Sequence, residues 1–245
     1  MLETTAGSGH YRRVPVDLRG ITTVVLPGTG SDDDYIRRAF SGPLRDAGAV
    51  LVAPPPRPGR LIEGYLSALD DAARGGPICV GGVSIGAAVA AAWALTHSDR
   101  TVAVLVALPA WLGTPDSAPA SVAARYSAER MRVDGLAATT AQMRASSPPW
   151  LGDELARSWA AQWPHLPDTM DEAAAYVAPS PAELARLTAP MGVVAAVGDS
   201  VHPLQVAADW VAAVPHAALR TVTLEEIGCQ TPALGSACLA ALAEI

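Results

Sequence analysis

A five-residue stretch, Gly82-Val83-Ser84-Ile85-Gly86, constrains the fold more than any other part of the chain. It lies between a short apolar run at 77–80 and an alanine-rich run at 87–95, which indicate a buried strand before it and a helix after it. A sharp turn between a strand and a helix displays a serine hydroxyl to the outside of the sheet. The glycines fit this turn, because a side chain at either position would collide with the neighbouring strand or helix. The pattern predicts a strand–turn–helix unit with Ser84 at its apex.

Two other interpretations of this region are weaker. The serine could stand by accident at a glycine-rich junction between a strand and a helix. A membrane helix over 78–95 would need eighteen uncharged residues, which the stretch has, but glycines and a serine interrupt it in the middle. The strand–turn–helix interpretation accounts for each of those residues.

Composition excludes several classes of protein. The chain has 245 residues, a formal net charge of −7 and no block rich in lysine or arginine, so it lacks the basic face that nucleic acid requires. Its three cysteines have no CxxC spacing, which favours neither a disulfide framework nor a zinc site and fits a reducing compartment. Residues 1–17 contain no apolar signal core. We expect a cytoplasmic protein that contacts neither nucleic acid nor membrane; the sequence does not indicate its oligomeric state.

Apolar runs alternate with amphipathic stretches along most of the chain. The runs at 21–26 and 101–108 are continuously apolar or β-branched, as in strands that are buried on both faces. Further strands are predicted at 49–53, 192–197 and 219–224, a weaker edge strand at 11–17, and helices at 61–73, 203–213 and 231–245. This alternation predicts an α/β fold, a mostly parallel sheet flanked by helices.

The alternation stops between 113 and 188. No β-branched run appears there, and helical patterns separated by prolines take its place. Leu155, Trp159 and Trp163 recur at four-residue spacing and form an apolar stripe on one predicted helix. Such a stripe either lines a pocket or packs the helix against its neighbours.

We interpret 113–188 as a helical lid that is inserted into a core made of 1–112 and 189–245. A capping box at 180–183, Ser-Pro-Ala-Glu, predicts one more helix start before the core resumes. A lid of this kind would cover the carboxyl edge of the sheet.

The loop at 27–31, Pro-Gly-Thr-Gly-Ser, follows a predicted strand and precedes a helix. Glycine-rich loops in this place present backbone N–H groups either to a phosphate or to an oxyanion. The phosphate interpretation is poor, because no Lys-Ser/Thr pair follows the glycines and Asp32, Asp33 and Asp34 would repel a phosphate. The aspartates suit the cap and first turn of the following helix instead.

With the turn at Ser84, the loop at 27–31, the inserted segment and the Gly-Asp-x-x-His-Pro run at 198–203, the chain from about residue 20 onwards resembles the α/β-hydrolase superfamily. Its alanine-rich style is similar to that of actinobacterial members. The resemblance implies that Ser84 is the nucleophile and Asp199 the acid of a catalytic triad. It also implies an oxyanion hole made by the backbone N–H groups of Thr29 and Ile85.

The histidine departs from the family's pattern. The family places its base in the loop after the last strand, where this chain has Cys229 and Gln230, and neither side chain can replace an imidazole. His202, three residues after Asp199, is the first candidate for the base, although a structural role is its default, and His165 in the predicted lid is the second. The remaining histidines, His10, His97 and His216, are predicted to be surface residues.

Three functions follow from these features. The favoured one is a serine hydrolase that cleaves an ester or thioester of a small, largely apolar acyl substrate without a cofactor or metal. The second is a hydrolase-fold protein that has lost its base and binds a small apolar ligand. The third keeps the pocket but performs a non-hydrolytic reaction, such as a lyase or cyclisation step, and nothing in the sequence selects it.

Overall fold

Six parallel strands form one sheet at the centre of a computed structural model that describes residues 16–245. The strand order is β2-β1-β3-β4-β5-β6. The strands are β1 (Thr22–Leu26), β2 (Val50–Val52), β3 (Ile78–Val83), β4 (Thr101–Ala107), β5 (Met191–Val197) and β6 (Ala217–Thr223). The predicted α/β fold with a parallel sheet is confirmed. Most of the edge strand predicted at 11–17 lies outside the described residues, and its last two residues, Val16 and Asp17, are not in a strand.

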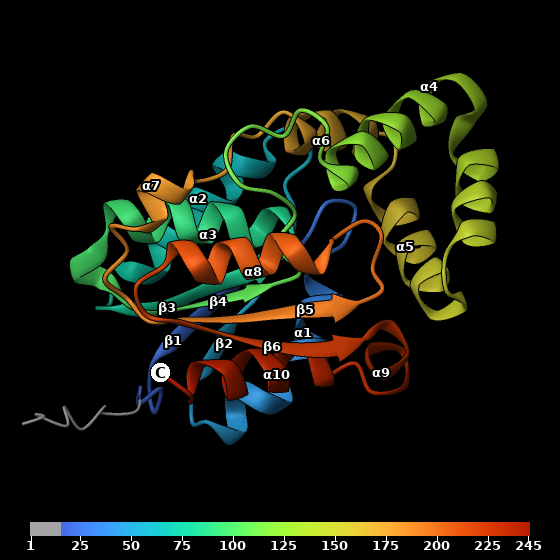
Figure 1. Ribbon diagram of the computed structural model, residues 1–245. Coiled ribbons are helices and arrows are strands. Elements are labelled where there is room, and N and C mark those ends of the chain that lie inside the picture. The colour runs from blue at the N-terminus through green and yellow to red at the C-terminus, as the bar shows by residue number, and fades with distance from the viewer. Residues whose placement is uncertain (1–15) are drawn as a thin grey trace, which may run out of the picture.

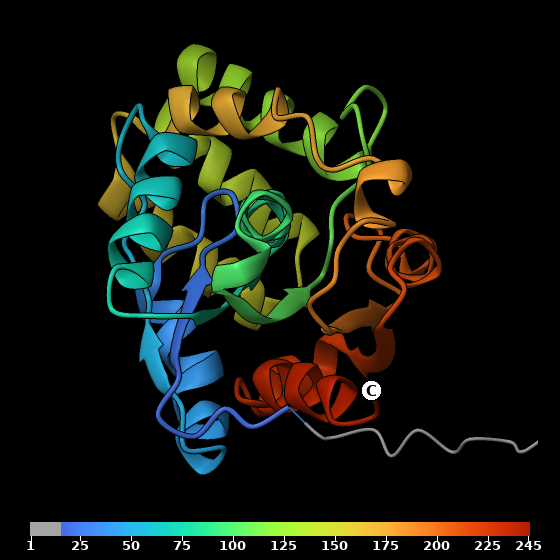
Figure 2. The ribbon, with the colours of Figure 1, turned by 90° about the vertical axis from the view of Figure 1, so that its left-hand side faces the viewer.

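Helices cover both faces of this sheet (Figures 1 and 2). The helices on one face are α1 (Asp33–Asp46) and α10 (Ala233–Leu242), and those on the other are α2 (Leu61–Ala73), α3 (Ile85–Thr96) and α8 (Leu204–Ala213). All six residues of β3 are buried, because helices pack on both of its sides. The short 3-10 helix η1 (Ser98–Arg100) follows α3 at the opposite end of the strands from Ser84.

A helical segment is inserted between β4 and β5. It consists of α4 (Pro119–Ser146), α5 (Pro149–Gln162) and α6 (Leu166–Ala174), and we call these three helices the inserted segment. Gly135, at φ 82°, kinks α4, so that the segment folds back on itself beyond the edge of the sheet (Figure 1). The segment has a small apolar core of its own, built around Met131, Trp159 and Met170. The short helix α7 (Pro181–Leu184) then returns the chain to the core, and the predicted capping box of Ser180 and Glu183 begins it.

The chain after β6 differs from the prediction. The region 225–232 was expected as a loop, but it contains the short helix α9 (Leu224–Cys229). Thr223 accepts a hydrogen bond from the backbone N–H of Glu226, whose carboxylate accepts one from the Thr223 N–H, and this capping box starts the helix directly at the end of the strand. The last helix, α10, begins at Ala233 rather than at the predicted residue 231, with Pro232 at its N-cap. None of the helices in residues 16–245 has the length and apolar character that crossing a membrane would require.

Candidate active site at the turn after β3

Ser84 stands alone in the turn between β3 and α3, with φ 55° and ψ −116°. Such a positive φ is strained for a residue with a side chain, and in the described part of the chain only Leu108 shares it among residues other than glycine. The Ser84 N–H donates to the carbonyl of Ala107 at the end of β4 (2.9 Å), which ties the turn to the neighbouring strand. The hydroxyl-bearing residue is therefore held in one backbone conformation by the sheet itself.

The glycines on either side allow this turn to be tight. A Cβ at position 82 would lie 2.3 Å from the carbonyl carbon of Gly86, and a Cβ at position 86 would lie 2.4 Å from the carbonyl oxygen of Leu26. Real side chains never come so close to backbone atoms. The predicted steric role of both glycines is confirmed.

The side chain of Ser84 meets His202, which comes from the other half of the sheet. The distance from Ser84 Oγ to His202 Nε2 is 3.0 Å, and His202 Nδ1 lies 3.0 Å from Asp199 Oδ2. Because a carboxylate faces Nδ1, that nitrogen carries the proton and donates it, which leaves Nε2 to accept from the serine hydroxyl. This chain of contacts has the geometry of a nucleophile, a base and an orienting carboxylate.

Asp199 and His202 share one tight turn after β5. Asp199 Oδ1 accepts hydrogen bonds from the backbone N–H groups of Val201 (2.8 Å) and His202 (3.1 Å), while Oδ2 accepts from the imidazole. Burial alone would raise the pKa of the Asp199 carboxyl, but the hydrogen bonds from the His202 side chain and from the backbone of His202 and Val201 outweigh it and hold this pKa below its ordinary value. The carboxylate thus stays ionised where it faces the imidazole.

The loop at 27–31 packs directly on the serine turn. A Cβ at Gly28 would lie 3.4 Å from the Cβ of Ser84, so the backbone of this loop touches the serine turn. Ile85 is the first residue of α3, and the N–H groups in the first turn of a helix have no intrahelical acceptor. The roles assigned to the Thr29 and Ile85 amides are compatible with this placement and remain predictions.

The other candidates for the base lie elsewhere. His165 precedes α6 and is exposed to solvent, and His216 is exposed before β6. Cys229 and Gln230 are also exposed, at the end of α9. Of the histidine, cysteine and glutamine residues considered from the sequence that lie within residues 16–245, His202 is the one that contacts Ser84, and His10 lies outside the described residues.

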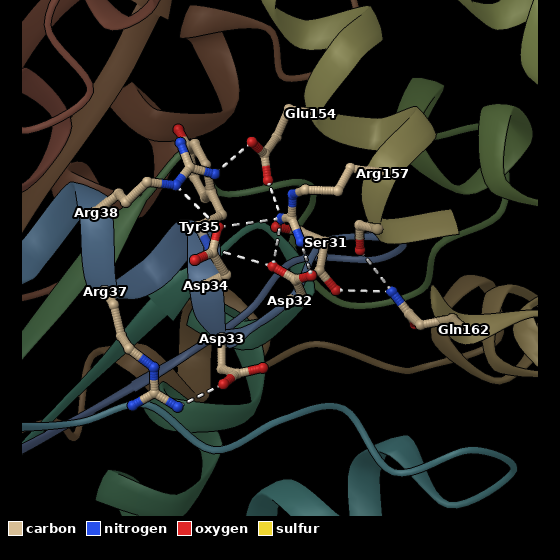
Figure 3. A network of polar contacts seen from close by, with 11 residues as sticks. Ser31, Asp32, Asp33, Asp34, Tyr35, Arg37, Arg38, Glu154, Arg157 and Gln162 are labelled. Carbon is tan, nitrogen blue, oxygen red and sulfur yellow. Dashed lines mark hydrogen bonds and ion pairs between the residues drawn. The ribbon is translucent and has the colours of Figure 1, made fainter. Parts of the chain in front are cut away.

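Sequence reasoning missed the contacts that join α5 to the loop after β1. Arg157 and Gln162 reach Asp32 and Ser31 across more than a hundred residues of sequence (Figure 3). No short motif announces these pairs, because each member follows an ordinary helical or loop pattern.

An acidic cluster beside this loop could in principle hold a cation. Asp32, Asp34 and Glu154 bring carboxylate oxygens within 4.8 Å of one another. Arg38 and Arg157 lie among them and form ion pairs with all three (Figure 3). With guanidinium groups already balancing its charge, the cluster is better described as an ion-pair network than as a metal site.

The sequence matches no protein-family model and no curated protein. Solved structures do match in fold. A hydrolase from Oleispira antarctica has a TM-score of 0.72 at 14% identity, over 92% of this chain and 93% of that one. An enol-lactonase from Burkholderia xenovorans LB400 has a TM-score of 0.68 at 17% identity, over 91% and 92%.

A third structure comes from a study of carboxylesterases of the thaumarchaeon Nitrososphaera gargenis. It has a TM-score of 0.71 at 14% identity, and the match covers 89% of this chain and 87% of that one. Identities this low establish architecture and no particular chemistry. These structural matches, together with the parallel sheet, its flanking helices and the segment inserted after β4, show that this chain has the α/β-hydrolase fold.

Proposed function

We propose that the protein is a serine hydrolase that cleaves an ester or thioester of a small, largely apolar acyl compound. One observation carries the proposal: Ser84 Oγ, His202 and Asp199 form a continuous hydrogen-bonded chain with two 3.0 Å steps at the carboxyl edge of the sheet. Serine is a weak nucleophile unless a base stands beside it, and His202 supplies that base. Solved structures of the same fold include a hydrolase, a structure from a carboxylesterase study and an enol-lactonase, in agreement with this class of reaction.

The reaction begins when His202 Nε2 takes the hydroxyl proton of Ser84 as Oγ attacks the acyl carbonyl carbon. The carbonyl oxygen becomes an oxyanion, which the N–H groups of Thr29 and Ile85 stabilise; each such donor is worth roughly 3–4 kcal/mol in the transition state. The bond to the leaving alcohol or thiol breaks, and this group receives the proton from His202. Water then attacks the acyl carbon while His202 takes its proton; the bond to Ser84 Oγ breaks, His202 returns the proton to Oγ, and the carboxylic acid is released. No cofactor or metal is needed in these steps.

The substrate class rests on what covers the site. Ser84 is only 7% exposed, and the inserted segment brings the apolar side chains of Trp159 and Met170 against Gly30 of the neighbouring loop. A site that is largely hidden from solvent, with apolar side chains packed on the adjoining loop, favours a small acyl group without charge. We therefore propose that 113–188 acts as the lid of a core formed by 1–112 and 189–245.

The direct test uses a fluorophosphonate probe and p-nitrophenyl esters of short acyl chains. Phosphonylation forms a bond between Ser84 Oγ and phosphorus as fluoride leaves, so the wild-type protein should be labelled and Ser84→Ala should not. His202→Ala should lose both labelling and ester hydrolysis, whereas His216→Ala, which alters an exposed histidine, should retain them. Absence of labelling in the wild type, or equal labelling of Ser84→Ala, would reject the proposal.

The two alternatives make different predictions. The ligand-binding alternative was motivated by the missing histidine at Cys229 and Gln230, and that motivation weakens with an imidazole 3.0 Å from Ser84. A lyase or cyclisation reaction would differ in its product. Turnover in ¹⁸O-labelled water introduces the label into the carboxylic acid if the reaction is hydrolysis, and leaves the product unlabelled otherwise.

A further inference from the structure

Helix α5 contacts three consecutive residues of the loop that follows β1. The indole of Trp159 packs on Gly30 so closely that a Cβ there would lie 2.6 Å from Nε1. Gln162 Nε2 donates to the carbonyl of Ser31 (3.0 Å). Arg157 then donates two parallel hydrogen bonds to Asp32, of 2.7 and 2.8 Å (Figure 3).

The two polar contacts are themselves fixed by further partners. The Gln162 amide also donates to Ser158 Oγ (2.8 Å), a side chain that is completely buried. Arg157 also pairs with Glu154, and Glu154 pairs in turn with Arg38 on α1. A bidentate arginine–carboxylate pair whose arginine has a further partner fixes the orientation of the two groups as well as their distance.

Asp32 is a rigid end point for this arrangement. It is 8% exposed, and its Oδ1 accepts the N–H of Tyr35 (3.2 Å), so that it caps α1 while it binds Arg157. Burial alone would raise the pKa of Asp32, but the hydrogen bonds from Arg157 outweigh it and hold this pKa below its ordinary value. The loop is thereby anchored by β1 at one end and by a capped, ion-paired aspartate at the other.

An oxyanion donor is effective only when it is held in place before the reaction. Displacement of a reacting group by about 1 Å costs on the order of 10²-fold in rate. The loop carries Thr29; one internal hydrogen bond, from the Ser31 N–H to the Gly28 carbonyl (3.0 Å), shapes it, and its middle has no bulky side chain. Its position relative to Ser84 therefore depends also on what lies against residues 30–32, where α5 makes the polar contacts.

On the basis of the proposed function, we propose that Arg157 and Gln162 are positioning residues that hold the loop at 27–32 so that the Thr29 N–H faces the acyl oxygen. The inserted segment then takes part in transition-state stabilisation, in addition to covering the substrate. Neither side chain touches the substrate; both act through the backbone of the loop.

The experiment compares Arg157→Ala, Arg157→Lys and Gln162→Met with a matched control. Arg132→Ala removes an arginine of the same segment that pairs with Asp168 and Asp171, away from the loop. We measure kcat and KM for a p-nitrophenyl ester, the affinity for a trifluoromethyl ketone that forms a hemiketal with the serine, and the melting temperature.

We expect kcat of Arg157→Ala to fall about 10- to 100-fold while KM stays within about two-fold, because the lost interaction operates in the transition state. Affinity for the trifluoromethyl ketone should fall in parallel. Arg157→Lys should recover part of the loss, Gln162→Met should show a smaller effect of the same kind, and Arg132→Ala should match the wild type in kcat and ketone affinity. Unchanged kcat and ketone affinity in folded Arg157→Ala, or equal losses in Arg132→Ala, would overturn the inference.

A double-mutant cycle tests whether Arg157 acts through Asp32. If it does, Asp32→Asn combined with Arg157→Ala should lose no more kcat than the larger of the two single changes, since both remove one contact. Fully additive losses would contradict it. Failure of the inference is distinct from failure of the proposed function: in the first case Ser84→Ala still abolishes turnover, and in the second the wild-type protein has no esterase activity to lose.

Discussion

The two loops that meet at Ser84 are held in opposite ways. The turn after β5 is self-contained, because Asp199 binds the backbone of Val201 and both the backbone and the side chain of His202. The loop at 27–32 is held from outside, by Arg157 and Gln162, which are 125 and 131 residues away in the chain. The proposed acid and base are therefore placed by local structure, whereas the proposed oxyanion donor is placed by tertiary contacts.

The largest expected effect is in the self-contained turn. His202→Ala should lower kcat/KM about 10⁴-fold or more, because Ser84 then has no proton acceptor. The melting temperature should change little, because the Asp199 carboxylate keeps its hydrogen bonds from the backbone N–H groups of Val201 and of residue 202. Steady-state kinetics and thermal denaturation check both statements, with His216→Ala as the control; substantial activity without His202 would remove it from the proposed mechanism.

Next in size is an effect at the point where the end of β1 and the start of the loop at 27–32 meet the serine turn. Gly86→Ala should lower the free energy of unfolding by about 2–3 kcal/mol, because its Cβ would lie 2.4 Å from the Leu26 carbonyl oxygen, and rigid backbone must move. The matched control is Gly75→Ala, whose Cβ would meet nothing closer than 3.9 Å. Urea denaturation measures both; equal stability of the two variants would contradict the close approach of β1 to the serine turn.

A smaller effect is expected in the pH dependence of the free energy of unfolding, to which Asp32 in the loop at 27–32 contributes. Because the folded-state pKa of Asp32 lies below its ordinary value of 3.8, its contribution to stability is complete above that value and is lost as the pH falls through the folded-state pKa. Asp32→Asn keeps a helix-capping side chain but loses the ion pair, so it should cost about 1 kcal/mol at neutral pH.

When the pH is lowered from 5 to 3, the free energy of unfolding of Asp32→Asn should fall less than that of the wild type. Denaturation curves over this range, with the exposed Asp46→Asn as control, test the sign. A wild-type curve that falls no more steeply than that of the variant would show that the pair with Arg157 contributes nothing to stability.

The smallest expected effect is at the position where the resemblance to α/β-hydrolases would place the base. Cys229→His and Gln230→His should leave kcat within about two-fold, because both residues are exposed and His202 already contacts Ser84. A large gain in esterase activity from either variant would instead favour the alternative in which the natural protein lacks a working base.

Features with a local cause could be predicted from the sequence. The strand–turn–helix unit around Ser84, the helix at 61–73 and the capping box at Ser180 all follow from residues within a few positions of one another. The proximity of Asp199 and His202 belongs to the same class, since their spacing places both in one turn. The capping box at Thr223 and Glu226 carried an equally local signal, but the expectation of a loop there obscured it.

The remaining features depend on contacts that no short pattern contains. The packing of Trp159 on Gly30 and the pairing of Arg157 with Asp32 arise only when the inserted segment packs against the loop after β1. A single sequence offers no way to pair residues over such separations. The stripe of Leu155, Trp159 and Trp163 illustrates the limit, because Trp159 is buried while Trp163 is largely exposed.

The place of His202 has a consequence for the end of the molecule. In the proposed mechanism the acid and the base both come before α8, so the residues from β6 to Ile245 are assigned a supporting role, in which α10 lies against β5 where Gly192 leaves room for it. A fluorescent or affinity tag fused to the carboxyl terminus should therefore leave the proposed proton relay undisturbed, provided that α10 stays packed against β5.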